Sequence, residues 1–230
     1  MKKCFFLLVI FLIVLPLKAQ FKRDPIINLE NFDKQRVHWG YFLGFNQYDF
    51  KFNYKENLGD VLVSKSIGFN VGLIGDLRIN DYFNLRLEPG LYYTQRNLGF
   101  PGFTQGDDFL REVKSTYIHV PLLIKASAKR YRNFKPYVVG GVSTSINLGS
   151  GEKSPDDNSN GTFRMKSTTY YYEVGFGIDF YLFYFKFSPS IRGVFAINDE
   201  LVPDADPNSP WTSNIDKMAS RGIFINFTFE

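Results

Sequence analysis

The feature that most constrains this sequence is an alternation of apolar and polar residues with a period of two. In one segment Tyr172, Val174 and Phe176 share one face, while glutamate and glycine occupy the other. Successive side chains of a β-strand point to opposite faces, so this period predicts strands with one apolar face and excludes amphipathic helices. The pattern recurs in eight segments, residues 37–46, 66–78, 83–94, 115–128, 135–148, 170–180, 183–195 and 222–229.

The connections between these segments alternate strictly between short and long. Short turns are expected at 80–81, at 129–133 and near Leu182, whereas the stretches 49–65, 95–114, 149–167 and 198–217 are long and polar. Transmembrane β-barrels have short periplasmic turns and longer outer loops. The sequence therefore predicts an all-β fold, an eight-stranded antiparallel up-and-down transmembrane β-barrel over residues 37–230, with both ends of the barrel domain on the periplasmic side.

The polar face decides which way the strands point. An eight-stranded barrel has an interior only just wide enough for side chains, which suits small residues and paired charges better than a row of aromatic rings. We therefore expect the apolar face to contact lipid, and a soluble barrel with the apolar face inside is the less favoured alternative. The inward charges should pair as a plug, and a proton or ion pathway is the second interpretation; they are Asp76, Arg78, Arg86, Glu88, Lys125, Glu173, Asp179, Lys186 and Arg192.

The first residues have the layout of a secretory signal peptide. Lys2 and Lys3 precede an apolar run that ends at Leu17, and the small residue Ala19 follows at the expected cleavage position. The run is short for a membrane-spanning helix, which needs about 20 residues. We expect a cleavable signal peptide at 1–19, a periplasmic segment at 20–36 and the barrel at 37–230. Cleavage lowers the net charge from +4 to +1, which gives no support to a nucleic-acid partner.

Few residues are suited to catalysis or to metal binding. The only cysteine, Cys4, lies in the predicted signal peptide, and the only histidines are His38 and His119. Disulfides, thiol catalysis and cysteine metal sites are thereby excluded from the mature chain. Ser127 and Glu173 are candidates for a nucleophile and an acid beside His119, but a packed lumen histidine is the better interpretation, and His38 is expected at the periplasmic rim. No catalytic residue, cofactor or metal site is predicted.

An acidic stretch in one long connection does not change that expectation. Asp156, Asp157 and Asn158 lack the full ligand spacing of a calcium loop and are interpreted as a solvated loop.

Aromatic residues in one of the long connections are candidates for partner contact. Phe100, Phe103 and Phe109 lie in the stretch 95–114, where large exposed rings would mark a binding surface. The alternative is that these rings fold back as a cap over the barrel mouth. The periplasmic segment before residue 37 is a second candidate contact.

Several motifs resemble the PorT family of Bacteroidetes outer-membrane proteins. The most specific is the opening, Asn31-Phe32-Asp33-Lys34, His38-Trp39-Gly40-Tyr41 and Leu43-Gly44-Phe45-Asn46; the segments 85–91, 117–125 and 136–141 also fit. The resemblance implies a cell outer-membrane component of the type IX secretion machinery that serves cargo export and gliding motility. It supplies no catalytic or ligand-binding residue.

The partners implied by this resemblance are outer-membrane lipid and other secretion-system proteins, with no nucleic acid and no small-molecule substrate. The alternative function is a small outer-membrane barrel enzyme, or a surface adhesin that binds through its long outer loops.

Overall fold

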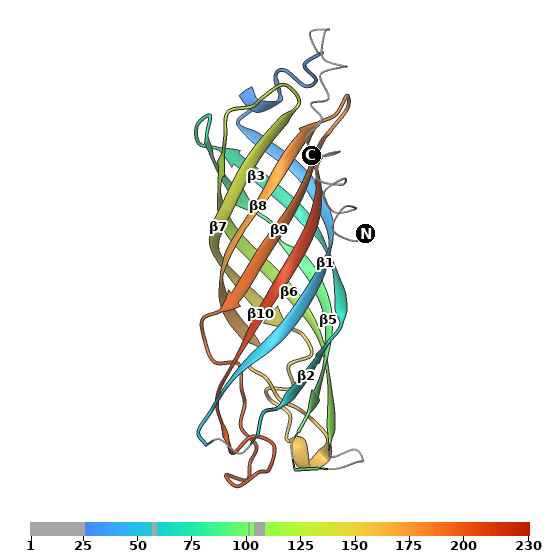
Figure 1. Ribbon diagram of the computed structural model, residues 1–230, viewed down its shortest axis with the longest axis vertical. Helices are drawn as coiled ribbons and strands as arrows, with labels where there is room; N and C mark the ends of the chain where they lie inside the picture. Colours follow the sequence, from blue (N-terminus) through green and yellow to red (C-terminus); the bar gives the residue numbers. More distant parts are fainter. Residues whose placement is uncertain (1–25, 57–58, 101, 104–108) are drawn as a thin grey trace, which may run out of the picture.

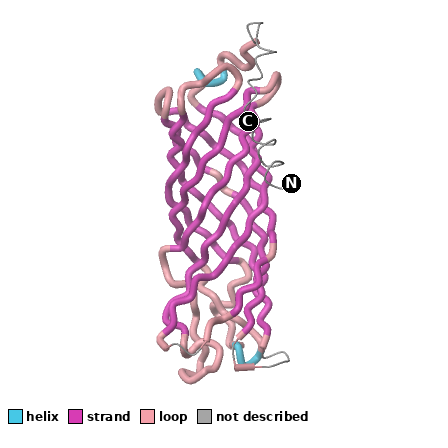
Figure 2. Tube along the Cα trace, viewed as in Figure 1, coloured by secondary structure: helices cyan, strands magenta, loops and turns pink. Residues whose placement is uncertain are grey.

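The protein forms one closed antiparallel β-barrel in a computed structural model (Figures 1 and 2), which describes residues 26–56, 59–100, 102–103 and 109–230. The predicted signal peptide at 1–19 lies outside the described residues. Among the described residues, no helix is long and apolar enough to cross a membrane. The strands are β1 (Val37–Tyr54), β2 (Leu62–Lys65), β3 (Ile67–Arg78), β4 (Phe83–Leu87), β5 (Gly90–Gly99), β6 (Leu110–Ser127), β7 (Phe134–Asn147), β8 (Thr168–Tyr181), β9 (Lys186–Ala196) and β10 (Ile215–Phe229).

Ten strands replace the eight that the sequence predicts, because two strand positions are each interrupted once. Leu87 of β4 faces Leu122 and Gly90 of β5 faces His119 without a change of register, so Pro89 breaks the ladder only by lacking an N–H group. The irregularity expected at Pro121 lies instead in this neighbouring strand, since β6 continues through Pro121. The up-and-down barrel fold is confirmed, with ten strands in eight positions.

The second interruption is a β-bulge at Ser66. Lys65 of β2 faces Arg96 of β5, whereas Phe69 of β3 faces Tyr93 of the same strand. An unbroken antiparallel pair would place Phe69 opposite residue 92. The strand formed by β2 and β3 therefore contains one residue more than the facing part of β5.

Closure joins the first strand to the last. Tyr41 of β1 faces Phe229 of β10, and the pairing continues to Tyr54 opposite Ile215. The other edge of β1 pairs with β3, and the remaining strands follow in sequence around the wall. Two short 3-10 helices, η1 (Phe32–Lys34) and η2 (Asn158–Asn160), lie outside the wall at opposite ends. We call the end with connections 79–82, 128–133 and 182–185 the short-turn end, and the other the long-loop end.

The apolar face of the strands points outward, as the sequence predicts. Phe45 and Phe176 are more than half-exposed on the outside of the wall. Trp39 and Tyr184 lie at the short-turn edge of this apolar belt, and Tyr170 lies at its other edge. Rings at both edges of an apolar belt are typical of a barrel that spans a membrane.

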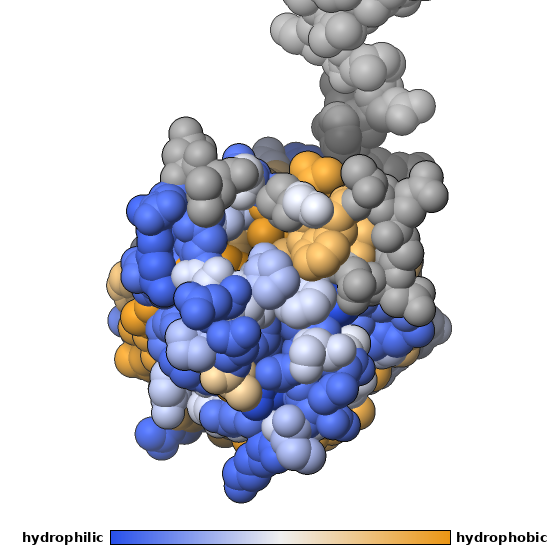
Figure 3. Space-filling view, turned by 90° about the horizontal axis from the view of Figure 1, so that it is seen from below, coloured by the Kyte–Doolittle hydropathy of each residue, from blue (hydrophilic) through white to orange (hydrophobic). Residues whose placement is uncertain are grey.

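Toward the long-loop end the alternation reverses, and apolar side chains point inward. Lys51 of β1 is exposed on the outside while its neighbour Phe50 is buried inside. A barrel wall surrounded by water packs its apolar face inside, and this end viewed along the axis is mostly hydrophilic (Figure 3). The buried cluster consists of Phe50, Val61, Leu98, Phe100, Val113, Met165, Leu201, Ile215 and Met218. The long loops expected at 49–65 and 95–114 are therefore largely wrong, because β1, β2, β5 and β6 continue through them.

The outward belt can be tested by placing a charge in its centre. Phe176→Arg should hinder folding into lipid bilayers, because an arginine at the bilayer midplane costs about 2–4 kcal/mol. Tyr170→Arg at the belt edge should cost only about 0–1 kcal/mol. The measurement is the fraction of heat-modifiable, folded barrel after insertion into liposomes. Equal folding of the two variants would contradict the belt.

Candidate functional site

The half of the lumen toward the short-turn end holds a buried network of charges. Arg86 forms ion pairs with Asp76 at 2.7 Å and with Glu230 at 3.0 Å, and Lys186 reaches the other oxygen of Glu230 at 2.8 Å. Asp76, Arg86 and Lys186 extend inward from three different strands. The C-terminal residue therefore joins one side of the lumen to the other.

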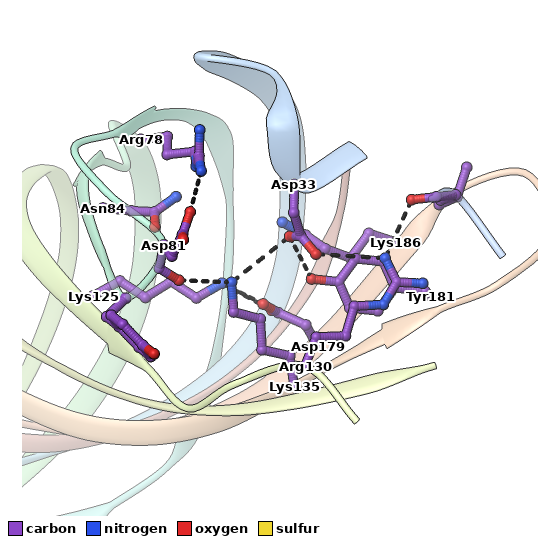
Figure 4. Close-up of polar contacts among 12 residues, drawn as sticks. Asp33, Arg78, Asp81, Asn84, Lys125, Arg130, Lys135, Asp179, Tyr181 and Lys186 are labelled. Carbon is purple, nitrogen blue, oxygen red and sulfur yellow. Dashed lines mark hydrogen bonds and ion pairs between the residues drawn. The ribbon is translucent and has the colours of Figure 1, made fainter. Parts of the chain in front are cut away.

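The remaining lumen charges extend this network, since Glu88 lies 3.4 Å from Arg86, and add a further pair. Lys125 contacts Asp179 at 2.6 Å, while Arg192 contacts Glu88 at 2.7 Å and Glu173 at 3.5 Å. Buried charges are tolerated when each has an opposite partner. The structure thus brings together eight of the nine charges singled out from the sequence. The ninth, Arg78, lies at the rim beside Asp81 (Figure 4).

His119 lies at the inner edge of this network between a hydroxyl and a carboxylate. Its Nδ1 is 2.5 Å from Ser145 Oγ and its Nε2 is 2.7 Å from Glu173 Oε1. A serine, an imidazole and a carboxylate in line are the parts of a nucleophile and its base. His119 is fully buried, however, with the rings of Tyr92 and Tyr171 on its edges.

The serine in this group is not the one that the sequence suggested. Ser127 lies close to the short-turn end, and its buried Oγ has no hydrogen-bond partner among the described residues. Ser145 faces His119 through the register of β6 against β7. Only that register identifies Ser145, so inspection of the sequence missed it.

Aromatic rings and one arginine separate the charges from the apolar cluster. The guanidinium of Arg96 lies 3.8 Å from the ring centre of Phe50 and donates to Tyr117 Oη at 2.7 Å. Tyr48 belongs to the same aromatic layer, where its ring stacks on that of Tyr117 with ring centres 5.5 Å apart. Charged, aromatic and apolar layers therefore follow one another along the lumen, an arrangement expected of a filled interior and not of a pore.

A cavity of about 370 Å³ opens at the short-turn end (Figure 4). Seven basic and four acidic side chains line it, which leaves an excess of positive charge. Asp33 lies among these cations: it accepts a hydrogen bond from Tyr181 Oη at 2.7 Å and lies 3.4 Å from Arg130 and 3.7 Å from Lys135.

Residues 26–36 lie across this mouth. The backbone N–H of Asn28 donates to Asn133 Oδ1 at 2.9 Å, and Asn133 Nδ2 donates to the carbonyl of Ile26 at 2.8 Å. Phe32 stacks on His38 with ring centres 4.3 Å apart, so His38 lies at the rim as expected. We call residues 26–36 the mouth segment.

The aromatic side chains proposed as outer contacts are largely packed. Phe100 is 1% exposed, so the prediction that it offers a contact surface is wrong. Phe103 stacks on Trp211 with ring centres 5.3 Å apart, and Phe109 is half-buried beside Gly99. These rings close the long-loop end as a cap.

Polar side chains of the outer loops form hydrogen bonds that stabilise the loops themselves. Hydrogen bonds from Ser159 and from the backbone of Ala205 lower the pKa of Asp157. Burial raises the pKa of Glu200, which accepts hydrogen bonds from Ser220. Within the described ranges, no group of histidine, cysteine and carboxylate side chains is arranged to hold a metal ion.

An apolar outer belt, aromatic edges, charged lumen and short turns at one end together define a β-barrel of the bacterial outer membrane. The chain belongs to the outer membrane protein β-barrel domain family, whose profile matches residues 19–202. It is therefore an outer-membrane protein. No curated protein sequence matches it significantly.

Solved structures of other outer-membrane proteins are similar at low identity. OprG of Pseudomonas aeruginosa is 13% identical, with 84% of this chain and 95% of that chain covered and a TM-score of 0.49. Neisserial surface protein A is 12% identical, with coverages of 84% and 98% and a TM-score of 0.43. Ail, the attachment invasion locus protein of Yersinia pestis, is 11% identical, with coverages of 85% and 99% and a TM-score of 0.40.

Removal of one lumen charge should destabilise the barrel. Glu173→Leu leaves Arg192 and His119 without their shared carboxylate, and breaking a buried pair costs about 3–5 kcal/mol. The control is Asp60→Ala, at an exposed loop carboxylate. Urea unfolding in detergent should show a lower midpoint for the lumen variant only, and equal midpoints would rule out the stabilising role.

The mouth segment should detach when its arginine anchor is removed. Arg130 donates to the carbonyls of Asn28 and Leu29 and lies 3.6 Å over the ring of Tyr181. Arg130→Ala should speed hydrogen exchange in residues 26–36 at least tenfold and leave β6 and β7 protected. Lys129→Ala, on the same turn, is the control. Unchanged exchange in Arg130→Ala would show that other contacts hold the segment.

Proposed function

We propose that this protein is an outer-membrane component of the type IX protein secretion machinery, where it acts through protein–protein contacts in cargo export and gliding motility. The observation that carries the proposal is the position of the motifs that resemble the PorT family. Asn31–Lys34 lies in the mouth segment, and His38–Asn46 forms the start of β1. The first part of the resemblance thus lies at the short-turn face, and the second runs from that face into the membrane-spanning wall.

The composition of that face supports a contact role. Glu30, Lys34 and Lys129 are exposed around the mouth, and all three line the cavity. Charged side chains at the rim of an interface give specificity and speed of association. Because short turns lie on the periplasmic side, the partner would be a periplasmic or membrane-embedded protein of the same machinery.

An enzymatic role is the weaker alternative, and the proposal treats the protein as non-enzymatic. A nucleophile must reach its substrate, yet Ser145, His119 and Glu173 are almost fully buried in the lumen. The other alternative is a surface adhesin, in which the long-loop end would form the binding surface. Its half-buried Phe103 and Trp211 would then be the contact residues.

Charge reversal at the mouth tests the proposal. Lys34→Glu with Lys129→Glu should reduce type IX cargo in the culture supernatant at least fivefold, because the partner meets repulsion where it met attraction. The matched control, Lys55→Glu with Lys153→Glu, reverses two exposed lysines at the long-loop end. Heat-modifiable migration verifies that both barrels fold. Normal secretion from the folded mouth variant would contradict the proposal, and loss from the control alone would favour an outer binding role.

A further inference from the structure

Four side chains form a row across the outside of the wall where the apolar belt ends. Tyr172 of β8 faces Phe195 of β9, which faces Arg221 of β10, which faces Asp49 of β1. The rings of Tyr172 and Phe195 stack with centres 5.1 Å apart. Stacked rings at the belt edge mark the level of lipid headgroups.

The wall changes from apolar to basic at this row. On the belt side, Ile225 of β10 faces Phe45 of β1. On the long-loop side, Ala219 faces Lys51, and Lys217 faces Asn53. Of the charged side chains that line the hollows here, four are cations and one is a carboxylate; the cations are Lys51, Lys65, Lys217 and Arg221, and the carboxylate is Asp49.

Two adjoining hollows of about 330 and 280 Å³ lie between these side chains, and Phe195 and Arg221 line both. The larger hollow is lined by Lys51, Lys217 and the small residue Ala219. The smaller hollow is lined by Lys65 and, on the belt side, by Ile223. Cationic groups and apolar surface are thus joined in one concave region.

The positive charge of this sector is only partly neutralised. Asp49 accepts hydrogen bonds from Arg221 at 3.0 and 2.7 Å and lies 3.1 Å from Lys65, so one carboxylate positions two cations. Lys51 has no ion pair within the part of the chain that the structure describes. Across the barrel, Lys114 of β6 is neutralised by Glu112 at 2.9 Å. The basic excess of this sector is therefore not repeated at Lys114.

We propose that this basic sector of β1, β2, β9 and β10 binds the phosphate group of a phosphorylated glycolipid in the outer leaflet. The guanidinium of Arg221, which Asp49 holds in place, and the ammonium groups of Lys51 and Lys217 contact the phosphate oxygens. The acyl chains lie along Ile223 and Phe195 into the belt. A soluble phosphate would use the cations alone, whereas the apolar part of the hollows is continuous with the lipid-facing wall.

The experiment measures lipid binding by the folded barrel in detergent micelles. Native mass spectrometry and the shift of the thermal midpoint are recorded with diphosphorylated lipid A, with dephosphorylated lipid A and with inorganic phosphate. Each basic side chain near an anionic lipid contributes about a fivefold change in affinity. Lys51→Ala with Lys217→Ala should therefore weaken binding of diphosphorylated lipid A at least tenfold. Asp49 and Arg221 are unchanged in this variant, so the ion pairs between β1 and β10 are preserved.

Lys114→Ala in the neutral sector is the matched control and should bind as the wild type does. Dephosphorylated lipid A and inorganic phosphate should bind at least tenfold more weakly than diphosphorylated lipid A. Equal binding by the wild type and the double variant would overturn the proposal. Binding of dephosphorylated lipid A as tight as that of diphosphorylated lipid A would also overturn it and would show an acyl-chain site. Equally tight binding of inorganic phosphate would overturn it too and would show a small-anion site.

Discussion

The rest of this structure depends on the closure of β1 against β10. In hydrocarbon no water is available to satisfy an open sheet edge, so every backbone N–H and C=O in the wall needs a partner in the next strand. Pairing from Tyr41–Phe229 to Tyr54–Ile215 supplies these partners for both edge strands. The breaks at Ser66 and Pro89 are tolerated because the ladder resumes on either side of them.

Closure with eight strand positions also fixes what the lumen contains. The interior is only just wide enough for side chains, and here three kinds of layer occupy it in turn: charges around Arg86, aromatic rings around Tyr92, and an apolar cluster around Leu98. Since the interior is filled, other molecules can contact the protein only at its two ends and on its outer wall. The mouth segment and the basic sector of β1, β2, β9 and β10 lie in these places.

The sequence predicted the membrane part of the fold well, because one period and one direction of apolarity hold from Trp39 to Phe45 and in the matching segments. It failed beyond the belt, where Phe50 and Phe52 carry the apolar pattern on the opposite face. The inward charges could be chosen from the same alternation, but their pairing depends on register between strands. Ser145 beside His119 and Asn28 on Asn133 are such long-range contacts, and no local pattern indicates them.

Because the alternation reverses along β1, one part of this strand must match lipid and the next part must match water. A slip of one residue would turn Asn46 and Tyr48 toward lipid or headgroups and, in the same movement, would turn Phe50 toward water. Each error alone is costly, since a one-residue shift moves every side chain to the other face. Together they penalise the same misalignment at both ends of one strand. The extension beyond the membrane therefore disfavours a wrong register of the part within it.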